Sequence, residues 1–392
     1  MKKTILMVVL LIGVATFAQK EELKTLKKIY AKEIPTKSDM EDYKAAVNSL
    51  ETLATSEEDK VYSNFYAGMK PMMDLISLGD KVTLQDQMRI FNPVALDKFT
   101  SSINQTLEFE KKSGKKIYTD DINETLSWFI PQLEQVAFQF NETKQYKIAS
   151  SIFYNLYKLD KESGSNLLNA AILSSQGKDF ATALKLYEEY RDSDYLKNGM
   201  TYYAVNKLND EEESFTSRKA RKTKLDLKTH EKPRDEKVAG RNNILKTIAV
   251  LKAETKDIAG AKKSYTDAKN EFPDDLNLLI EEANFYYNQN EVATYRNLIK
   301  EIIKKDPTNA SLHFNIGYLS LSEDVSLVEE INKNLDKPKV YDELMAKRKA
   351  LYQSALPHFE ESYRLDPTNE NTKIMLKSTY ETLGMKDKAA KL

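Results

Sequence analysis

The sequence predicts an all-α fold, a solenoid of stacked helix-turn-helix repeats. Three small residues, Ala249, Ala283 and Gly317, follow one another at a spacing of 34 residues. The same spacing separates four further pairs: Ala137 and Ala171, Ala149 and Ala183, Ala355 and Ala389, and Pro273 and Pro307. A fixed period of this length is typical of helix pairs that bury their apolar faces against one another in an array. The 11 glycines and 10 prolines among 392 residues are too few for a β-sandwich with many turns.

The N-terminus predicts export. Lys2 and Lys3 form a basic start, residues 4–14 form a short apolar core, and small residues before and at Ala18 suit cleavage there. We therefore expect residues 1–18 to be a signal peptide. The apolar run is too short to span a bilayer, and a retained N-terminal anchor is the alternative interpretation.

The net charge and the cysteine count limit the functions that the sequence allows. The net charge of −1 gives no overall field that would attract nucleic acid or anionic lipid. The absence of cysteine excludes disulfides, thiol chemistry and cysteine metal sites. A chain of this size can be held together by its apolar core alone.

The clearest repeats lie in residues 242–309. The first helix carries Ile248 and Ala249, and the second carries Ala261 and Tyr265 before it ends at Pro273. Proline cannot continue a helix, so it ends one unit and precedes the next. In chain order we expect degenerate helical repeats in residues 19–129, a repeat pair in residues 130–193, repeat units in residues 242–322 and C-terminal repeat helices in residues 350–392.

Three insertions interrupt the array. The first covers about residues 78–92 and is followed by a helix over residues 93–111. The second covers residues 194–241, where alternation around residues 208–210 predicts a β-hairpin between residues 202 and 215, followed by a charged helical piece. The third, residues 323–349, lies between the two helices of one unit and displaces Ala355 by 26 residues from its unbroken position.

These residues resemble the tetratricopeptide repeat (TPR) family. Its pattern has small residues or alanine at the eighth, twentieth and twenty-seventh positions, aromatic residues at the eleventh and twenty-fourth, and proline at the thirty-second. Counted from Asn242, the chain supplies Ala249, Ala261, Tyr265, Ala268 and Pro273. Departures include Lys252 in place of an aromatic residue and Tyr295 in place of a small one. An exported array with such insertions resembles uncharacterised envelope proteins of Bacteroidetes-type bacteria.

The resemblance implies a binding groove lined by the first helix of each unit. Carried onto the best repeats, the groove positions are Lys246, Ile280, Asn284, Tyr287, Asn288, Phe314 and Tyr318. Aromatic and amide side chains with little net charge suit an extended peptide or an amphipathic helix. Packing against neighbouring helices is the alternative role for Phe314 and Tyr318.

No pattern in the sequence predicts a catalytic, metal or cofactor site. The basic run at residues 218–224 closely follows the acidic residues 211–213, so we expect mutual neutralisation and no binding of nucleic acid. His230, His313 and His358 fall in different units and lack metal-ligand spacing. The chain has no Gly-rich phosphate loop, no GxSxG and no HExxH.

The leading hypothesis is an exported, non-enzymatic scaffold that binds a protein or peptide partner in its groove. The expected location is the periplasm or cell envelope of a Gram-negative bacterium, in an outer-membrane or envelope complex. The alternative is a structural or assembly subunit that uses its convex and insertion surfaces. A glycan-binding or enzymatic module in an insertion ranks last, because the insertions are short and charged.

Overall fold

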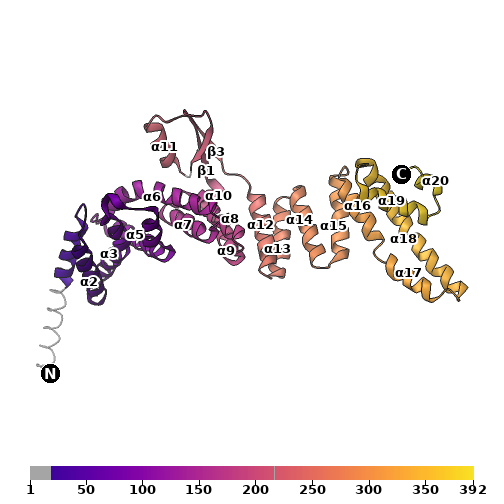
Figure 1. Cartoon of the computed structure of the whole chain (residues 1–392), viewed down its shortest axis with the longest axis horizontal. Coiled ribbons are helices and arrows are strands. Elements are labelled where there is room, and N and C mark those ends of the chain that lie inside the picture. The colour runs from indigo at the N-terminus through magenta and orange to yellow at the C-terminus, as the bar shows by residue number, and fades with distance from the viewer. Residues whose placement is uncertain (1–18, 216) are drawn as a thin grey trace, which may run out of the picture. The chain divides into compact units, whose positions relative to one another are not determined.

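The computed structural model describes residues 19–215 and 217–392. The expected signal peptide, residues 1–18, lies outside these described residues. The chain divides into two compact units: unit 1 ends at Ala239, and unit 2 runs from Gly240 to Leu392. Helices dominate both units (Figure 1). In the part of the chain that is described, no helix is both long enough and apolar enough to cross a membrane.

Unit 1 is a succession of helices, each packed on a neighbour. After a helical stretch at residues 19–30, its elements are α2 (Lys37–Leu53), α3 (Glu57–Ile76), a short 3-10 helix (Gly79–Lys81), α4 (Leu84–Ile90), α5 (Pro93–Ser113), α6 (Thr119–Glu142), α7 (Tyr146–Leu159), α8 (Gly164–Gln176), α9 (Phe180–Asp192) and α10 (Asp194–Asn198). α3 packs on α5, α6 on α7, α7 on α8, and α8 on α9. Each helix therefore packs mainly on a neighbour one or two α-helices away in the chain, as a solenoid requires.

The alanines at 34-residue spacing lie where these helices cross. Ala137 of α6, Ala149 of α7, Ala171 of α8 and Ala183 of α9 each have 0% of their surface exposed. A methyl side chain lets two helix backbones approach closely, while larger residues such as the buried Phe153 fill the space beside the crossing. The 34-residue spacing of alanines in the sequence therefore corresponds to a regular spacing of close helix contacts in the structure.

Glu110 fixes the start of α6 from the neighbouring helix α5. The side chain of Tyr118, which directly precedes α6, forms no cap. The buried Glu110 carboxylate instead accepts hydrogen bonds from the backbone N–H groups of Tyr118 and Thr119, at 2.9 and 3.0 Å, and from the Thr119 hydroxyl, at 2.6 Å. A carboxylate at this end satisfies free N–H groups and complements the helix dipole.

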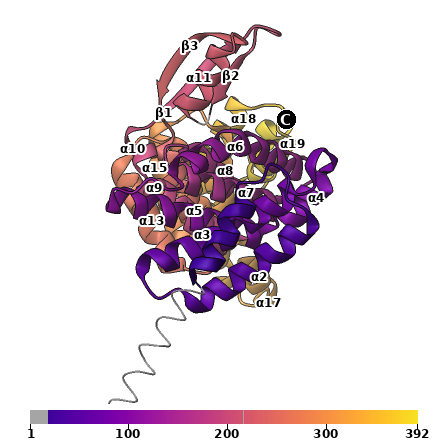
Figure 2. The ribbon, with the colours of Figure 1, turned by 90° about the vertical axis from the view of Figure 1, so that its left-hand side faces the viewer.

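The second insertion forms a three-stranded antiparallel sheet and a helix. The elements are β1 (Met200–Asn206), β2 (Glu212–Phe215), α11 (Arg218–Asp226) and β3 (His230–Lys237), and the strand order is β2-β1-β3. β1 and β2 make the hairpin that the sequence predicts, with Tyr203 opposite Ser214. Figures 1 and 2 show the strands and α11 standing clear of the helices that precede them in unit 1.

The third strand was not predicted, because β3 lacks the alternation of apolar and polar residues that marks a strand. Its sequence is almost entirely charged and contains Pro233. The register explains how proline is accommodated: Val205 pairs with Glu231 and Tyr203 with Arg234, so two residues of β3 oppose Ala204. This is a β-bulge at a sheet edge, where proline is tolerated because no ladder hydrogen bond is lost.

Unit 2 contains the clearest helix pairs. Its helices are α12 (Arg241–Glu254), α13 (Ile258–Glu271), α14 (Leu276–Asn288), α15 (Val292–Lys305), α16 (Ala310–Ser320), α17 (Asp324–Lys333), α18 (Pro338–Leu365), α19 (Glu370–Thr382) and α20 (Lys386–Ala389). α12 pairs with α13, α14 with α15, and α16 with α18. Ala249, Ala283 and Ala355 are fully buried at these contacts. A Cβ atom at Gly317 would lie 2.8 Å from the Phe359 ring, so the α16–α18 contact requires glycine there.

Two helices run longer than the repeat pattern predicts. α6 passes through residue 130, where the sequence analysis begins a repeat pair, and Pro131 lies within it. α18 passes through residue 350, where that analysis ends the third insertion. No glycine or proline lies between Pro338 and Pro357, so the inserted segment and the second helix of the unit merge into one helix of 28 residues. The structure confirms the all-α solenoid with an inserted hairpin.

We predict that Ala183→Arg unfolds the protein at a markedly lower temperature. The substitution places a long charged side chain at a fully buried crossing, which should lower the free energy of unfolding by about 3 kcal/mol or more. Ala181→Arg is the matched control, because Ala181 is exposed on the same helix. Equal melting temperatures of the two variants, measured by circular dichroism, would contradict the proposed register.

Candidate functional site

The residues predicted to bind a partner lie on the first helices of three helix pairs within unit 2. We call them the first-helix face: Lys246 of α12, Ile280, Asn284, Tyr287 and Asn288 of α14, and Phe314 and Tyr318 of α16. α12 and α14 contact each other directly. Side chains three and four positions apart share one side of a helix, which places Asn284, Tyr287 and Asn288 together on α14.

The centre of the first-helix face is exposed. Tyr287 has 52% and Tyr318 has 57% of its surface exposed, and Asn284 and Asn288 are also exposed. None of these four side chains has a hydrogen-bond partner among the described residues. The side of α14 that faces away from them is buried, with Leu278 at 1% and Leu279 at 4%. The helix therefore presents amides and an aromatic ring outward while its small and aliphatic residues hold the core.

Ile280 and Phe314 are half-buried and contribute to packing. Ile280 packs partly against the apolar core formed by α14, α15 and α16. The Phe314 ring lies 5.8 Å, centroid to centroid, from the buried Phe359 ring of α18 and stacks on Tyr318 at 6.1 Å. Phe314 thus connects the exposed Tyr318 to the core of the unit.

A second ring contact positions Tyr287. Its ring centroid lies 5.1 Å from that of Tyr295 on α15. The Tyr295 hydroxyl accepts a hydrogen bond of 3.0 Å from the Asn315 side chain of α16. Burial raises the pKa of Tyr295 despite this hydrogen bond, so the hydroxyl stays neutral at physiological pH. The contact ties α14, α15 and α16 together beneath the exposed Tyr287.

The first-helix face carries little net charge. Lys246, its one cation, is half-buried near the Asp275 carboxylate. The pKa of Asp275 is lowered by a hydrogen bond from Asn242, with a smaller contribution from the Lys246 charge. Asp275 also caps α14 by accepting from the Leu278 N–H at 3.1 Å. The positive charge of Lys246 is therefore partly balanced within the unit.

One residue of this surface was missed by the sequence analysis. Ile374 is the fifth residue of α19, as Ile280 is of α14 and Phe314 of α16, and 60% of its surface is exposed. The signal was present in the sequence, because Ile374 lies 60 residues after Phe314, which is one period of 34 plus the displacement of 26. We add Ile374 to the first-helix face.

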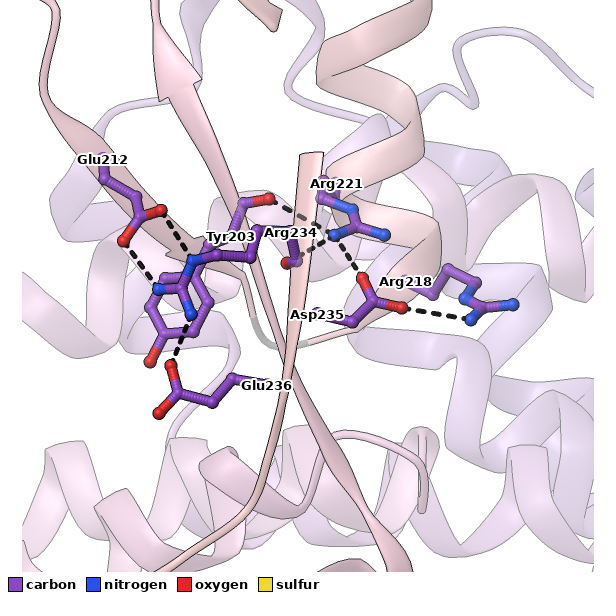
Figure 3. Close-up of polar contacts among 7 residues, drawn as sticks. All are labelled: Tyr203, Glu212, Arg218, Arg221, Arg234, Asp235 and Glu236. Carbon is purple, nitrogen blue, oxygen red and sulfur yellow. Dashed lines mark hydrogen bonds and ion pairs between the residues drawn. The ribbon is translucent and has the colours of Figure 1, made fainter. Parts of the chain in front are cut away.

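The inserted sheet carries a network of charged side chains, which Figure 3 shows in close-up. On one side of the sheet the Arg234 guanidinium lies over the Tyr203 ring, 4.2 Å from its centroid. It donates to Glu212 at 2.8 and 3.0 Å and to Glu236 at 2.5 Å. Arg234 thereby bridges β3 to β2 across the central strand.

Arg221 of α11 joins the helix to the other side of the sheet. It is buried, donates to the backbone oxygens of Tyr203 and Arg234 at 3.2 and 2.8 Å, and pairs with Asp235 at 2.5 Å. The more exposed Arg218 also pairs with Asp235, at 3.3 Å. The hydrogen bond from Arg221 is the main cause that lowers the pKa of Asp235. Buried arginine is tolerated because each of these contacts satisfies its donors.

The expected neutralisation of the basic run holds only in part: hydrogen bonds from Asn206 and His230, and to a smaller extent the charge of Lys224, lower the pKa of Glu213. The acidic partners of Arg218 and Arg221 come from β3 rather than from residues 211–213. Glu212 pairs with Arg234, and Glu213 lies 3.0 Å from His230. The charges of β2 and α11 both pair with β3, but with different residues of it: β2 with His230 and Arg234, and α11 with Asp235.

Two of the histidines are closer than the sequence indicated. His313 of α16 and His358 of α18 belong to the same helix pair, and their ring centroids lie 6.0 Å apart. The third insertion lies between them in the chain, so the repeat spacing does not show that they belong to one helix pair. Among the described residues, no group of three or more His, Cys, Asp or Glu could hold a metal ion.

Comparisons with known proteins return similar folds only. No protein family model matches the chain, and no curated protein matches it. Among solved structures, YrrB, described as a TPR protein with an unusual peptide-binding site, is 10% identical with a TM-score of 0.34, over 66% of this chain and 96% of YrrB.

Two further solved structures are comparable. Pseudomonas aeruginosa PilF is 9% identical with a TM-score of 0.36, over 67% of this chain and 87% of PilF. A tetratricopeptide repeat protein from Parabacteroides merdae is 14% identical with a TM-score of 0.29, over 92% of this chain and 98% of that protein. The fold of this chain follows from its own helix pairs, and its function must be argued from its own residues.

We predict that Arg221→Met loosens the inserted sheet while Arg218→Met does not. Loss of Arg221 leaves two buried-side backbone oxygens without this donor and leaves Asp235 with only the more exposed Arg218, whereas Arg218 makes one exposed ion pair. Hydrogen exchange at the amides of β1 and β3 should speed up at least about tenfold in the first variant only. Equal exchange in both variants would show that Arg221 does not hold α11 to the sheet.

Proposed function

We propose that this protein is an exported, non-enzymatic scaffold that binds an extended segment of a protein partner on the first-helix face of unit 2. The observation that supports the proposal is the exposed set of Asn284, Tyr287, Asn288 and Tyr318, whose polar groups have no partner among the described residues. The helices beneath this set are held by buried packing.

The chemistry of the face suits a peptide backbone flanked by apolar side chains. The amides of Asn284 and Asn288 can donate to and accept from main-chain groups, and Tyr287 and Tyr318 offer flat apolar area with a polar tip. Tyrosine is among the residues that dominate binding energy at interfaces. The near-neutral charge of the face favours a partner segment without a strong charge. A rigid helix array loses little entropy on binding.

Export and residence in the cell envelope belong to the same proposal. The support is the basic start, apolar core and small residues that end at Ala18. Expression of the full chain in a Gram-negative host tests this part. The expected product is periplasmic and begins at Gln19 by intact mass; a full-length cytoplasmic product would refute export.

The binding prediction uses Asn284→Ala combined with Tyr287→Ala. Both side chains are exposed, so the cost to stability should be small, about 1 kcal/mol from the lost Tyr287–Tyr295 ring contact. Affinity capture of partners from native envelope extract should fall at least about tenfold, because exposed tyrosines and amides carry the contact.

The matched control is Asn297→Ala combined with Lys300→Ala, two exposed positions on α15. It should capture the partner as the wild-type protein does. Full capture by the folded Asn284 and Tyr287 variant would show that the partner binds outside the first-helix face.

The alternative of an assembly subunit has one supporting observation. Lys219 and Lys224 are exposed on α11 and form no salt bridge among the described residues, although the charge of Lys224 contributes to a lowered pKa of Glu213. Lys219→Glu with Lys224→Glu should leave capture unchanged if the first-helix face binds the partner. Loss of a large envelope complex in this variant, with capture intact in the Asn284 and Tyr287 variant, would favour the assembly role.

A further inference from the structure

Unit 1 contains a pocket that the groove hypothesis does not use. It has a volume of about 170 Å³ and lies among α3, α4, α5, α6 and α7. Its inner wall consists of buried apolar side chains: Leu75, Phe91, Phe129, Leu133, Phe140 and Ile152. Because these residues are only 3–8% exposed, the pocket penetrates the helix packing.

The inner wall is largely aromatic. The rings of Phe91 and Phe129 lie 4.8 Å apart, centroid to centroid, and close one side of the pocket. Protein interiors are normally packed without voids of this size, since each missing contact costs dispersion energy. An apolar cavity of comparable size, about 150 Å³, holds benzene or xenon in preference to water.

The rest of the lining is uncharged and mixes further apolar side chains with three amides. Gln87 of α4, Asn92 before α5 and Gln132 of α6 supply amides, and no Asp, Glu, Lys, Arg or His lines the pocket. Asn92 already caps α5 by accepting from the N–H groups of Val94 and Ala95. The amides of Gln87 and Gln132 have no hydrogen-bond partner among the described residues. They remain available to a bound molecule.

We propose that this pocket binds a small neutral molecule with an apolar body and an uncharged polar head. The body would be about the size of a benzene ring or a six-carbon chain and would contact Phe91, Phe129 and Phe140. The head would exchange hydrogen bonds with Gln87 and Gln132. A charged head is disfavoured, because no side chain of the lining could pair with it after it loses its water.

Hexan-1-ol is the probe for this proposal, with hexanoate and hexylammonium as analogues of the same chain length. Titration calorimetry and NMR of the full mature chain should show binding of hexan-1-ol with a Kd of about 1 mM or tighter, since burial of each methylene group favours binding. Both charged analogues should bind at least about tenfold more weakly. No binding of hexan-1-ol up to its solubility, or equal binding of all three probes, would overturn the proposal.

A pocket-filling variant locates the binding. Val136 of α6 lines the pocket and is half-buried, so Val136→Phe should place a ring inside it and weaken hexan-1-ol binding at least tenfold. Gln135→Phe is the matched control, because the neighbouring Gln135 is exposed and is not part of the lining. Ile148→Phe fills the same space from α7 and replaces Val136→Phe if that variant fails to fold. Wild-type affinity in a folded pocket-filling variant would place the probe elsewhere.

Discussion

The close approach of helices at small residues is the constraint on which the rest of this structure depends. Ala183 and Ala283 are fully buried at such crossings, and Gly317 lies where even a methyl group would collide with the Phe359 ring. Since each crossing fixes the distance between two helices, it also fixes which side chains can face outward. The exposure of Asn284 next to the buried Ala283 follows from this packing, because adjacent positions on a helix point about 100° apart.

The sequence was sufficient to predict the helix pairs because one physical requirement recurs at a fixed interval. Small residues and turn prolines such as Pro273 mark each crossing and each helix end, so their spacing specifies the repeat. Helix length was less predictable. The merging of the third insertion with α18 depends on the absence of a glycine or proline before Pro357, and no periodic signal reports such a continuation.

The candidate site could be located from the sequence only as a set of positions. Repeat numbering places Asn284 and Tyr318 on the first helices, but it does not separate the half-buried Phe314 from the exposed Tyr318. That difference arises from a contact with Phe359, which lies across an insertion whose path the sequence does not show. The pocket of unit 1 was unpredictable for a related reason, because it arises from imperfect packing among five helices. Charge pairing in the inserted sheet likewise depends on strand register.

The bulge in β3 has a consequence for self-association. An exposed sheet edge is a template on which a second chain can add a strand, which is a common route to aggregation. At β3 an incoming strand would meet Pro233, which offers no N–H group, a backbone displaced at Lys232, and charged side chains along almost the whole edge. The proline, the bulge and the charged residues that keep β3 from showing a strand pattern in the sequence also oppose the addition of a further strand. The inserted sheet can therefore project into solvent while its outer edge stays unpaired.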